Sequence, residues 1–301
     1  EVTSEGSRIV LGMEGAFGEW DYSSALFRSA NEATDRYVGG YVLFDQFDAG
    51  VRNGTINPFG PSSAAGQALI DSITIDDDAR KSEGVSQGID FNFTRSLMEL
   101  DGGYMGLALG GEFRNESQEF TPSALLLSNN IAGDRDSTLG PGESTLVATD
   151  EDRDIFSAYA ELNAPVSETL ELQAALRFDE YSEVGSTFNP KFGMRWQPHE
   201  DLIVRASAGT GFRAPSLNDL YRPTVFGVTS SLITDPQCVD QEGSIDLCTD
   251  QWPVERRSNP DLDPERSRQF SAGFVYEPNA QFNVGVEYFW PHEVDNTFDA
   301  E

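Results

Sequence analysis

Histidine and cysteine carry much of the nucleophilic, acid–base and metal chemistry of proteins, and this chain has only two of each. The histidines, His199 and His292, lie far from each other and from the cysteines, Cys238 and Cys248. Two histidines offer little acid–base chemistry, and a metal site usually needs more ligands than such a sparse set supplies. No Ser/His/Asp, HExxH, P-loop or paired-carboxylate spacing stands out. We therefore predict that the chain is not an enzyme and holds no metal or cofactor.

The two cysteines lie close together in a stretch that is rich in Pro, Asp and Gly. This composition is typical of a loop, and a short loop closed by a disulfide is common in oxidising compartments. We predict a disulfide between Cys238 and Cys248, with two reduced thiols as the alternative.

Carboxylates are the most abundant chemically active groups, with 51 acidic against 20 basic residues and a formal net charge of -31. This balance argues against nucleic-acid binding, which needs clusters of Lys and Arg. The acidic runs 76–78 and 150–154 do not follow the calcium-loop pattern with its central glycine. We interpret the acidity as a source of solubility and repulsion between loops, with binding of cations or basic ligands as the alternative.

The dominant pattern along the chain is an alternation of apolar and polar residues with period two, which is typical of β-strands. In the stretch 202–213, for example, Leu202 and Val204 alternate with Arg205. The mean hydropathy is -0.40 and no apolar run of about 18 residues occurs, so no transmembrane helix is expected. The pattern predicts ten strands, most of them near the length of a tilted membrane-spanning strand, at 8–17, 22–30, 86–97, 103–114, 153–164, 170–179, 188–196, 202–213, 266–277 and 280–290.

The connections between these strands fall into two classes. Short turns lie at 18–21, 100–102, 165–167, 197–200 and 277–279, whereas long loops rich in Gly, Pro, Asp and Ser occupy about 31–85, 115–152 and 214–265. All the short turns come at one end of the strands, and the long loops come at the other, together with the short connection 183–186. An outer-membrane barrel has this asymmetry, with short periplasmic turns and long extracellular loops. A soluble β-sandwich has no reason to show it.

Charged residues in the middle of the strands favour a wet or plugged lumen over the open face of a small sandwich. The basic ones are Arg177, Arg195 and Arg205. Aromatic residues near the strand ends suit the interfacial girdles of a membrane barrel; they are Trp20, Tyr104, Tyr181, Phe188, Trp196, Phe212 and Tyr276.

Three segments resemble the barrel of TonB-dependent outer-membrane receptors. The first runs from Leu176 to Pro198. The second, Phe212-Arg213-Ala214-Pro215-Ser216-Leu217-Asn218-Asp219-Leu220-Tyr221, is similar to the family's "FRAPs…eLy" segment, which opens a large loop. The third, Asn259-Pro260-Asp261-Leu262-Asp263-Pro264-Glu265-Arg266-Ser267, is similar to the "NPxLxPExS" segment that closes this loop. The resemblance covers most of 1–290 and is strongest over 150–290.

The resemblance implies an all-β, antiparallel transmembrane barrel that closes with 22 strands around an N-terminal plug. It also implies substrate binding by the outer loops and the plug, and energy supplied by the inner-membrane TonB complex. No segment here resembles the plug or the TonB box, so we expect 1–301 to be a partial barrel domain of about ten strands with the plug absent. The candidate residues that face the lumen and the plug are Arg177, Arg195, Arg205, Arg213 and Glu265.

The leading functional hypothesis is energy-coupled uptake, across the outer membrane, of a scarce nutrient such as a ferric siderophore, haem, cobalamin or an oligosaccharide. The partners expected from it are outer-membrane lipid, the protein's own plug, the TonB complex and a small-molecule or oligosaccharide ligand, with no nucleic acid. A passive porin is an alternative transporter. An acidic secreted or surface β-protein, acting as an adhesin or carbohydrate binder, is an alternative of a different class.

Overall fold

The structure is a computed structural model that describes residues 1–135, 139–140, 142–242, 244–245 and 247–295. Within these ranges, no helix is both long enough and apolar enough to cross a membrane.

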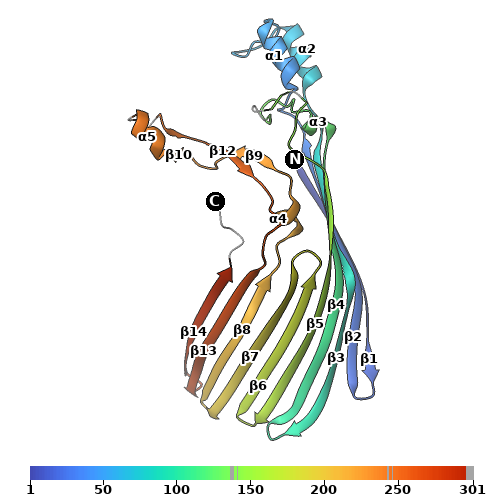
Figure 1. Cartoon of the computed structure of the whole chain (residues 1–301), viewed down its shortest axis with the longest axis vertical. Helices are drawn as coiled ribbons and strands as arrows, with labels where there is room; N and C mark the ends of the chain where they lie inside the picture. Colours follow the sequence, from blue (N-terminus) through green and yellow to red (C-terminus); the bar gives the residue numbers. More distant parts are fainter. Residues whose placement is uncertain (136–138, 141, 243, 246, 296–301) are drawn as a thin grey trace.

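The molecule is dominated by one curved, antiparallel sheet in which ten strands follow one another in sequence order (Figure 1). The all-β prediction of an incomplete barrel of about ten strands is confirmed. Each predicted strand corresponds to one strand of this sheet, and the sheet remains open because β1 and β14 are its two edges. The strands are β1 (Val2–Phe17), β2 (Trp20–Tyr37), β3 (Asp77–Leu100), β4 (Gly103–Pro122), β5 (Thr149–Ser167), β6 (Leu170–Tyr181), β7 (Gly185–His199), β8 (Leu202–Arg213), β13 (Glu265–Asn279) and β14 (Phe282–Asp295).

Five two-residue turns join the strands at one end of the sheet, and the long connections lie at the other (Figure 1). The turns are 18–19, 101–102, 168–169, 200–201 and 280–281. In the first of them Gly18 has φ 62°, a left-handed conformation that glycine adopts without a steric penalty. The separation of short turns from long loops is thus a property of the fold as well as of the sequence.

Several strands are longer than the alternation predicted. β3 has 24 residues and β4 has 20, so β3 spans about 80 Å, far more than the roughly 9–11 residues that cross a bilayer. The connections are correspondingly shorter than the predicted loops, at 38–76, 123–148 and 214–264. The prediction fell short because the outer parts of these strands are polar on both faces, and such strands carry no alternation of hydropathy.

One face of the sheet, which we call the apolar face, carries rows of exposed hydrophobic side chains. Cross-strand pairing aligns one residue from each of β1 to β5 in such a row, and all five are at least 39% exposed. They are Leu11, Leu26, Ile89, Phe113 and Phe156. On the same face, six residues nearer to the long connections and about 20 Å away, each strand carries a carboxylate instead. This row consists of Glu5, Glu32, Glu83, Glu119 and Asp150.

The other face, which we call the polar face, takes the alternate residues. The row next to the hydrophobic one runs through β3 to β7 as Asp90, Glu112, Ser157, Asp179 and Thr187. The period of two therefore separates an apolar surface from a polar one over most of the sheet.

Two of the long connections pack together into a small cap (Figure 1). The first contains α1 (Phe44–Arg52) and α2 (Ala64–Ile73), and the second contains α3 (Ala124–Leu127). Isolated bridges join Val42 to Thr74 and Leu43 to Ile131. A hydrophobic core of Tyr37, Ile75, Ala79 and Ile131 lies where the cap meets the sheet. Pattern reading missed these helices because each has ten residues or fewer and lies in a segment dense in Gly, Pro and Ser.

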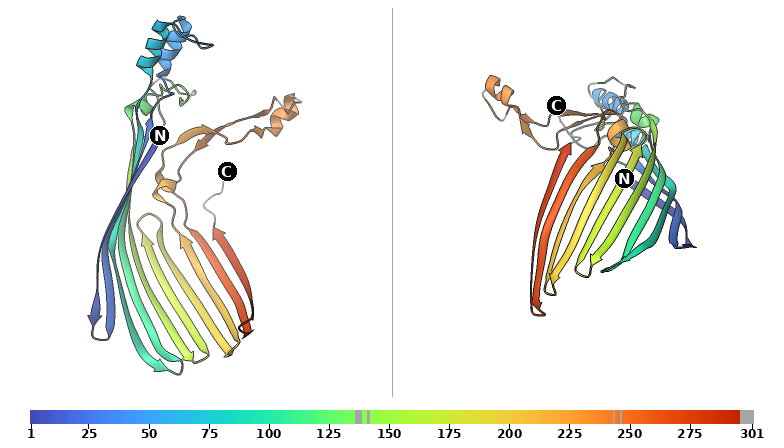
Figure 2. Two further views of the ribbon diagram at one scale, coloured as in Figure 1. Left: turned by 180° about the vertical axis from the view of Figure 1, so that it is seen from behind. Right: turned by 60° about the horizontal axis from the view of Figure 1, so that its bottom comes forward.

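The third long connection, residues 214–264, forms an arm that extends away from the sheet (Figure 2). Its base is α4 (Leu217–Tyr221). The rest comprises β9 (Val225–Val228), β10 (Ile233–Thr234), α5 (Pro236–Glu242), β11 (Thr249–Asp250) and β12 (Pro253–Arg256), with β9 paired to β12 and β10 to β11.

Candidate functional site

The three arginines predicted in mid-strand all lie on the polar face. Arg177 on β6 pairs with Asp179, with 2.8 Å between Nη2 and Oδ1. Arg195 on β7 donates from Nη2 to the Gln197 side-chain oxygen at 2.8 Å. Arg205 on β8 stands directly opposite Arg195 and makes no ion pair within the described residues. That these arginines face a plug remains a prediction.

Arg213 and Glu265 meet at the neck of the arm. Arg213 ends β8, Glu265 begins β13, and the two are cross-strand partners. Nε of Arg213 donates to Oε2 of Glu265 at 2.7 Å. The Glu265 side chain is 16% exposed and that of Arg213 is 65% exposed, so the pair sits half in solvent. Its position closes the arm at the point where the chain leaves the sheet and returns to it.

The two segments that resemble family motifs are brought side by side, although about 40 residues separate them. The N–H of Asn259 donates to the carbonyl of Asp219 at 3.0 Å. Ser216 caps α4 by accepting from the Asp219 N–H, while the Asp219 carboxylate accepts from the Ser216 N–H in return. The remaining motif residues extend this base on both sides: Phe212, Ala214 and Pro215 precede the cap, and Pro260, Leu262 and Pro264 follow Asn259.

Arg153 on β5 fixes the base of the arm to the polar face. Its guanidinium donates to the Pro215 carbonyl at 2.7 Å and to Oε2 of Glu116 at 2.9 and 2.6 Å. It also lies over the Tyr181 ring, 5.3 Å from the centroid, and only 10% of the side chain is exposed. A buried, two-point contact with a carboxylate is geometrically specific. The start of the arm is therefore held by a residue that lies 62 positions earlier in the chain.

The charges around Arg153 form a balanced network. Glu116 also pairs with Arg114, whose Nη1 lies 2.9 Å from Glu112. Ionised groups in such partly buried positions are expected to be paired, since an unpaired charge would lose its hydration without compensation. Next to this network, the Ser157 hydroxyl donates to the buried carboxylate of Asp179 at 2.6 Å.

Sequence reasoning did not identify this network. In the sequence, Arg153 belongs to the acidic run 150–154 and begins the strand predicted at 153–164, and neither pattern assigns it a role at the arm. The alternation Arg153, Ile155, Ser157 places it on the polar face, but nothing local reveals its contact with Pro215. The cap at Ser216 was open to recognition, because a serine followed three residues later by an acidic residue is a helix-start signature.

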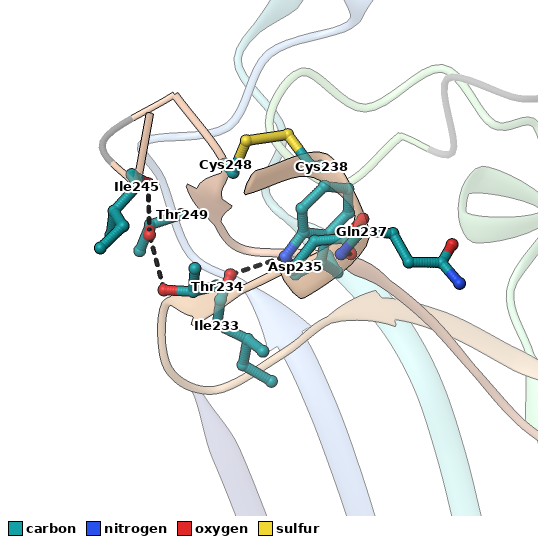
Figure 3. The surroundings of a disulfide bond; sticks show 9 residues. Ile233, Thr234, Asp235, Gln237, Cys238, Ile245, Cys248 and Thr249 are labelled. Atoms are coloured by element: carbon teal, nitrogen blue, oxygen red, sulfur yellow. Dashed lines mark hydrogen bonds between the residues drawn. A yellow bond between two sulfur atoms is a disulfide. The ribbon is translucent and has the colours of Figure 1, made fainter. Parts of the chain in front are cut away.

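A disulfide between Cys238 and Cys248 braces the tip of the arm, with 5.6 Å between the two Cα atoms (Figure 3). The carbonyl of Cys248 accepts from the Asp235 N–H at 2.9 Å, and the hydroxyls of Thr234 and Thr249 lie 2.7 Å apart. These contacts join β10, α5 and β11 into one small unit.

Desolvation raises the pKa of the Tyr221 phenol in α4, and the nearby carboxylates of Glu183 and Glu151 add to this effect. Within the described ranges, no group of three or more His, Cys, Asp or Glu side chains is arranged to hold a metal ion.

A family model, described as TonB dependent receptor-like β-barrel, matches residues 10–292. The chain is also similar to solved structures. The siderophore receptor PirA from Acinetobacter baumannii aligns with a TM-score of 0.64 at 15% identity, over 98% of this chain and 35% of that one. A mutant of the ferric enterobactin receptor PfeA from Pseudomonas aeruginosa gives 0.63 at 15% identity over the same shares, and the FrpB iron transporter from Neisseria meningitidis gives 0.52 at 17% identity, over 98% and 37%.

Identities this low show the shared fold alone, and this chain spans about a third of the length of these structures. Among curated proteins, no sequence matches it.

Proposed function

The chain belongs to the TonB-dependent receptor-like β-barrel family, and on that premise we propose that it forms part of the wall and outer loops of an outer-membrane importer. The importer takes up a scarce nutrient in a TonB-dependent, energy-coupled manner. Candidate nutrients are a ferric siderophore, haem, cobalamin or an oligosaccharide. The similar structures include receptors for siderophores and for ferric enterobactin, at 15% identity to this chain.

The observation that carries this proposal is the division of the sheet into two chemically different faces. Hydrophobic side chains such as Phe113 and Phe156 are 48% and 45% exposed on the apolar face, which would be unfavourable in water but suits contact with lipid. The adjacent row on the polar face holds Glu112, Ser157 and Asp179, which suits a wet or plugged lumen.

In this proposal the long connections are extracellular and the two-residue turns are periplasmic. Arg177, Arg195 and Arg205 face the lumen and the plug, and the Arg213–Glu265 pair holds the neck of the arm above it. The partners are outer-membrane lipid, the plug of the full-length protein, the TonB complex and the ligand.

An adhesin or soluble carbohydrate-binding protein is not favoured, because it would leave the hydrophobic rows of the apolar face in water. A passive porin would have the same kind of barrel wall, but its transport would not depend on energy. The energy dependence of uptake therefore distinguishes a porin from a TonB-dependent importer.

The test is uptake by cells that lack the gene and by cells complemented with it. Growth is measured with iron, haem, cobalamin or an oligosaccharide limiting in turn, and uptake of the limiting nutrient is then followed with a radiolabel. We expect complementation to restore accumulation, and a protonophore to abolish it. Accumulation that persists with the protonophore would indicate a porin, and the absence of any gene-dependent uptake would refute import.

A further inference from the structure

A groove of about 470 Å³ runs along the polar face beside the base of the arm. Its floor consists of small residues from β2 and β3, with Ser29 opposite Ser86 and Asn31 opposite Gly84. Gln118 and Glu116 of β4 continue the floor, and Leu217 of α4 forms a wall. The volume falls within the range of about 300–1,000 Å³ that is typical of small-molecule sites.

The groove offers neutral hydrogen-bonding groups. The hydroxyls of Ser29, Ser82 and Ser86 make no hydrogen bond to protein within the described part of the chain, and each can both donate and accept. The Asn31 amide adds N–H donors, since its oxygen already accepts from Ser4 at 3.1 Å, and the Gln118 amide adds an acceptor oxygen, since its nitrogen contacts Asn218 at 3.5 Å. A ligand whose own groups both donate and accept, as alcohol hydroxyls do, would match this set.

The charged residues that line the groove are Glu83, Glu116 and Arg153, so carboxylates outnumber cations there. Arg153 already pairs with Glu116 at 2.6 Å, so it is not available to a ligand carboxylate or catecholate without giving up this contact. Arg8 lies opposite Ser29 on the edge strand β1, outside the residues that line the groove. Repulsion by the chain's net charge of -31 further disfavours anions.

An aromatic side chain stands close by. Phe120 is the cross-strand partner of Ser82, and with Leu217 it lines a second hollow of about 250 Å³, whose lining also includes Arg80 and Arg222. An aromatic face next to neutral hydroxyls and amides suits a molecule that has both hydroxyl edges and an apolar C–H face.

We infer that this groove binds an uncharged, polyhydroxylated ligand of the saccharide type, and not a polyanionic iron chelate. The inference rests on the proposed uptake function and narrows its substrate class. The hydroxyls of Ser29, Ser82 and Ser86 contact the ligand edge, and Leu217 covers its face.

Glycines on the polar face provide a direct test. A Cβ added at Gly84 meets nothing within 4 Å, so Gly84→Phe extends into the groove without a backbone clash. Gly106 also lies on the polar face and its Cβ would meet nothing within 4 Å, but it is remote from the groove, so Gly106→Phe is the matched control.

The experiment uses the full-length protein purified in detergent and isothermal titration calorimetry. The probes are neutral hexasaccharides of glucose, xylose and galactose, together with the iron(III) complex of 2,3-dihydroxybenzoate. We expect at least one hexasaccharide to bind, and Gly84→Phe to weaken it by about tenfold or more, because the ring occupies the ligand's space. Gly106→Phe should change its affinity by less than about twofold, since distant sites act independently.

Binding of the iron complex alone, or of none of the hexasaccharides, overturns the saccharide assignment. Equal losses in the two glycine variants overturn the location. These outcomes are independent of the uptake test, because equilibrium binding to purified protein needs neither TonB nor a proton gradient. Failure of energy-coupled uptake with intact saccharide binding would instead refute the import function.

Discussion

The two faces of the sheet are built from alternate residues of the same strands, yet in the part of β2 to β5 beyond the hydrophobic rows they treat charge in opposite ways. On the polar face, Glu116 lies between Arg114 and Arg153, and Arg153 is 10% exposed. On the apolar face beyond the hydrophobic rows, Glu83 stands directly opposite both Glu32 and Glu119. Lys81 pairs with Glu32 at 2.8 Å, but the row itself is a line of like charges.

The difference shows that burial, not strand pairing, decides where charges must be matched. A carboxylate in water is solvated and screened, so like charges on neighbouring strands cost little. A carboxylate beneath the arm has lost much of its water and needs a partner. The buried pair of Arg153 and Glu116 therefore lies where α4 covers the sheet, whereas exposed pairs such as that of Lys81 and Glu32 occur elsewhere.

The largest effect is expected from placing a charge in the hydrophobic rows. Phe91 is 40% exposed on the apolar face, and Phe91→Arg should destabilise the protein by about 2–4 kcal/mol in a bilayer, as for a cation at mid-depth on a barrel's lipid face. The control is Asn115→Arg on the same face, next to Asp154, which should cost less than about 1 kcal/mol. Urea unfolding from lipid vesicles measures both, and equal costs would contradict contact with lipid.

Breaking the buried network of the polar face should have the next largest effect. Arg153→Ala leaves Glu116 paired with Arg114 alone. It also removes the hydrogen bond that the guanidinium donates to the Pro215 carbonyl. We expect a loss of about 2–3 kcal/mol, below the usual cost of a broken buried pair because Glu116 is 25% exposed. Faster hydrogen exchange in 214–221 is the specific readout.

The matched control for this change is Arg28→Ala on the apolar face, where Arg28 is exposed and bonded to Gln87. It should cost less than about 0.5 kcal/mol. If hydrogen exchange in the arm base did not distinguish the two variants, the anchoring role of Arg153 would be wrong.

The described residues of the arm tip, around α5, extend away from both faces of the sheet (Figure 2), so the stability of the tip should be separable from that of the sheet. Replacing Cys238 and Cys248 with Ser removes a constraint on a short loop, which is worth about 2–3 kcal/mol in the chain-entropy model. We expect faster proteolysis and hydrogen exchange at 232–250, with the unfolding of the sheet unchanged. Weaker protection throughout the sheet would show that tip and sheet are coupled.

The smallest effect is expected from neutralising one member of the acidic row. Glu119→Gln removes like-charge contacts with Glu83 and Asp150 and should stabilise the protein by about 0.2–1 kcal/mol at low salt. The gain should shrink as salt is added. Glu116→Gln, three residues away on the polar face, should do the reverse and destabilise. If both variants changed the free energy of unfolding in the same direction, the contrast between the two faces would be wrong.

Much of the fold was available from local sequence. A period of two identifies a strand and sorts its side chains, so Leu202, Val204 and Arg205 were enough to define β8 and its two faces. Turn residues gave the strand ends nearest the two-residue turns to within three residues, but the predicted turns 165–167 and 277–279 were wrong, because these residues form the ends of β5 and β13. The ends nearest the long connections were wrong by up to nine residues, as at Asp77, because a strand that is polar on both sides has no hydropathy signal.

The candidate site was only partly predictable. The neck residues Arg213 and Glu265 came from the resemblance, and the paired strands place them together. Arg153 and Glu116 were missed because their importance depends on α4 lying above them. The groove beside them was also hidden, since Ser29, Ser86 and Gln118 look like ordinary polar strand residues when read singly.

The sequence by itself therefore determined the strands, the chemical character of each face and the separation of short turns from long loops. Each of these depends on residues within a few positions of one another. Tertiary structure alone decided which strand regions continue past the hydrophobic rows, where α4 rests and which charges become buried. The contact of Arg153 with Pro215 joins positions 62 residues apart, and no local pattern encodes a contact that forms only after the intervening strands have paired.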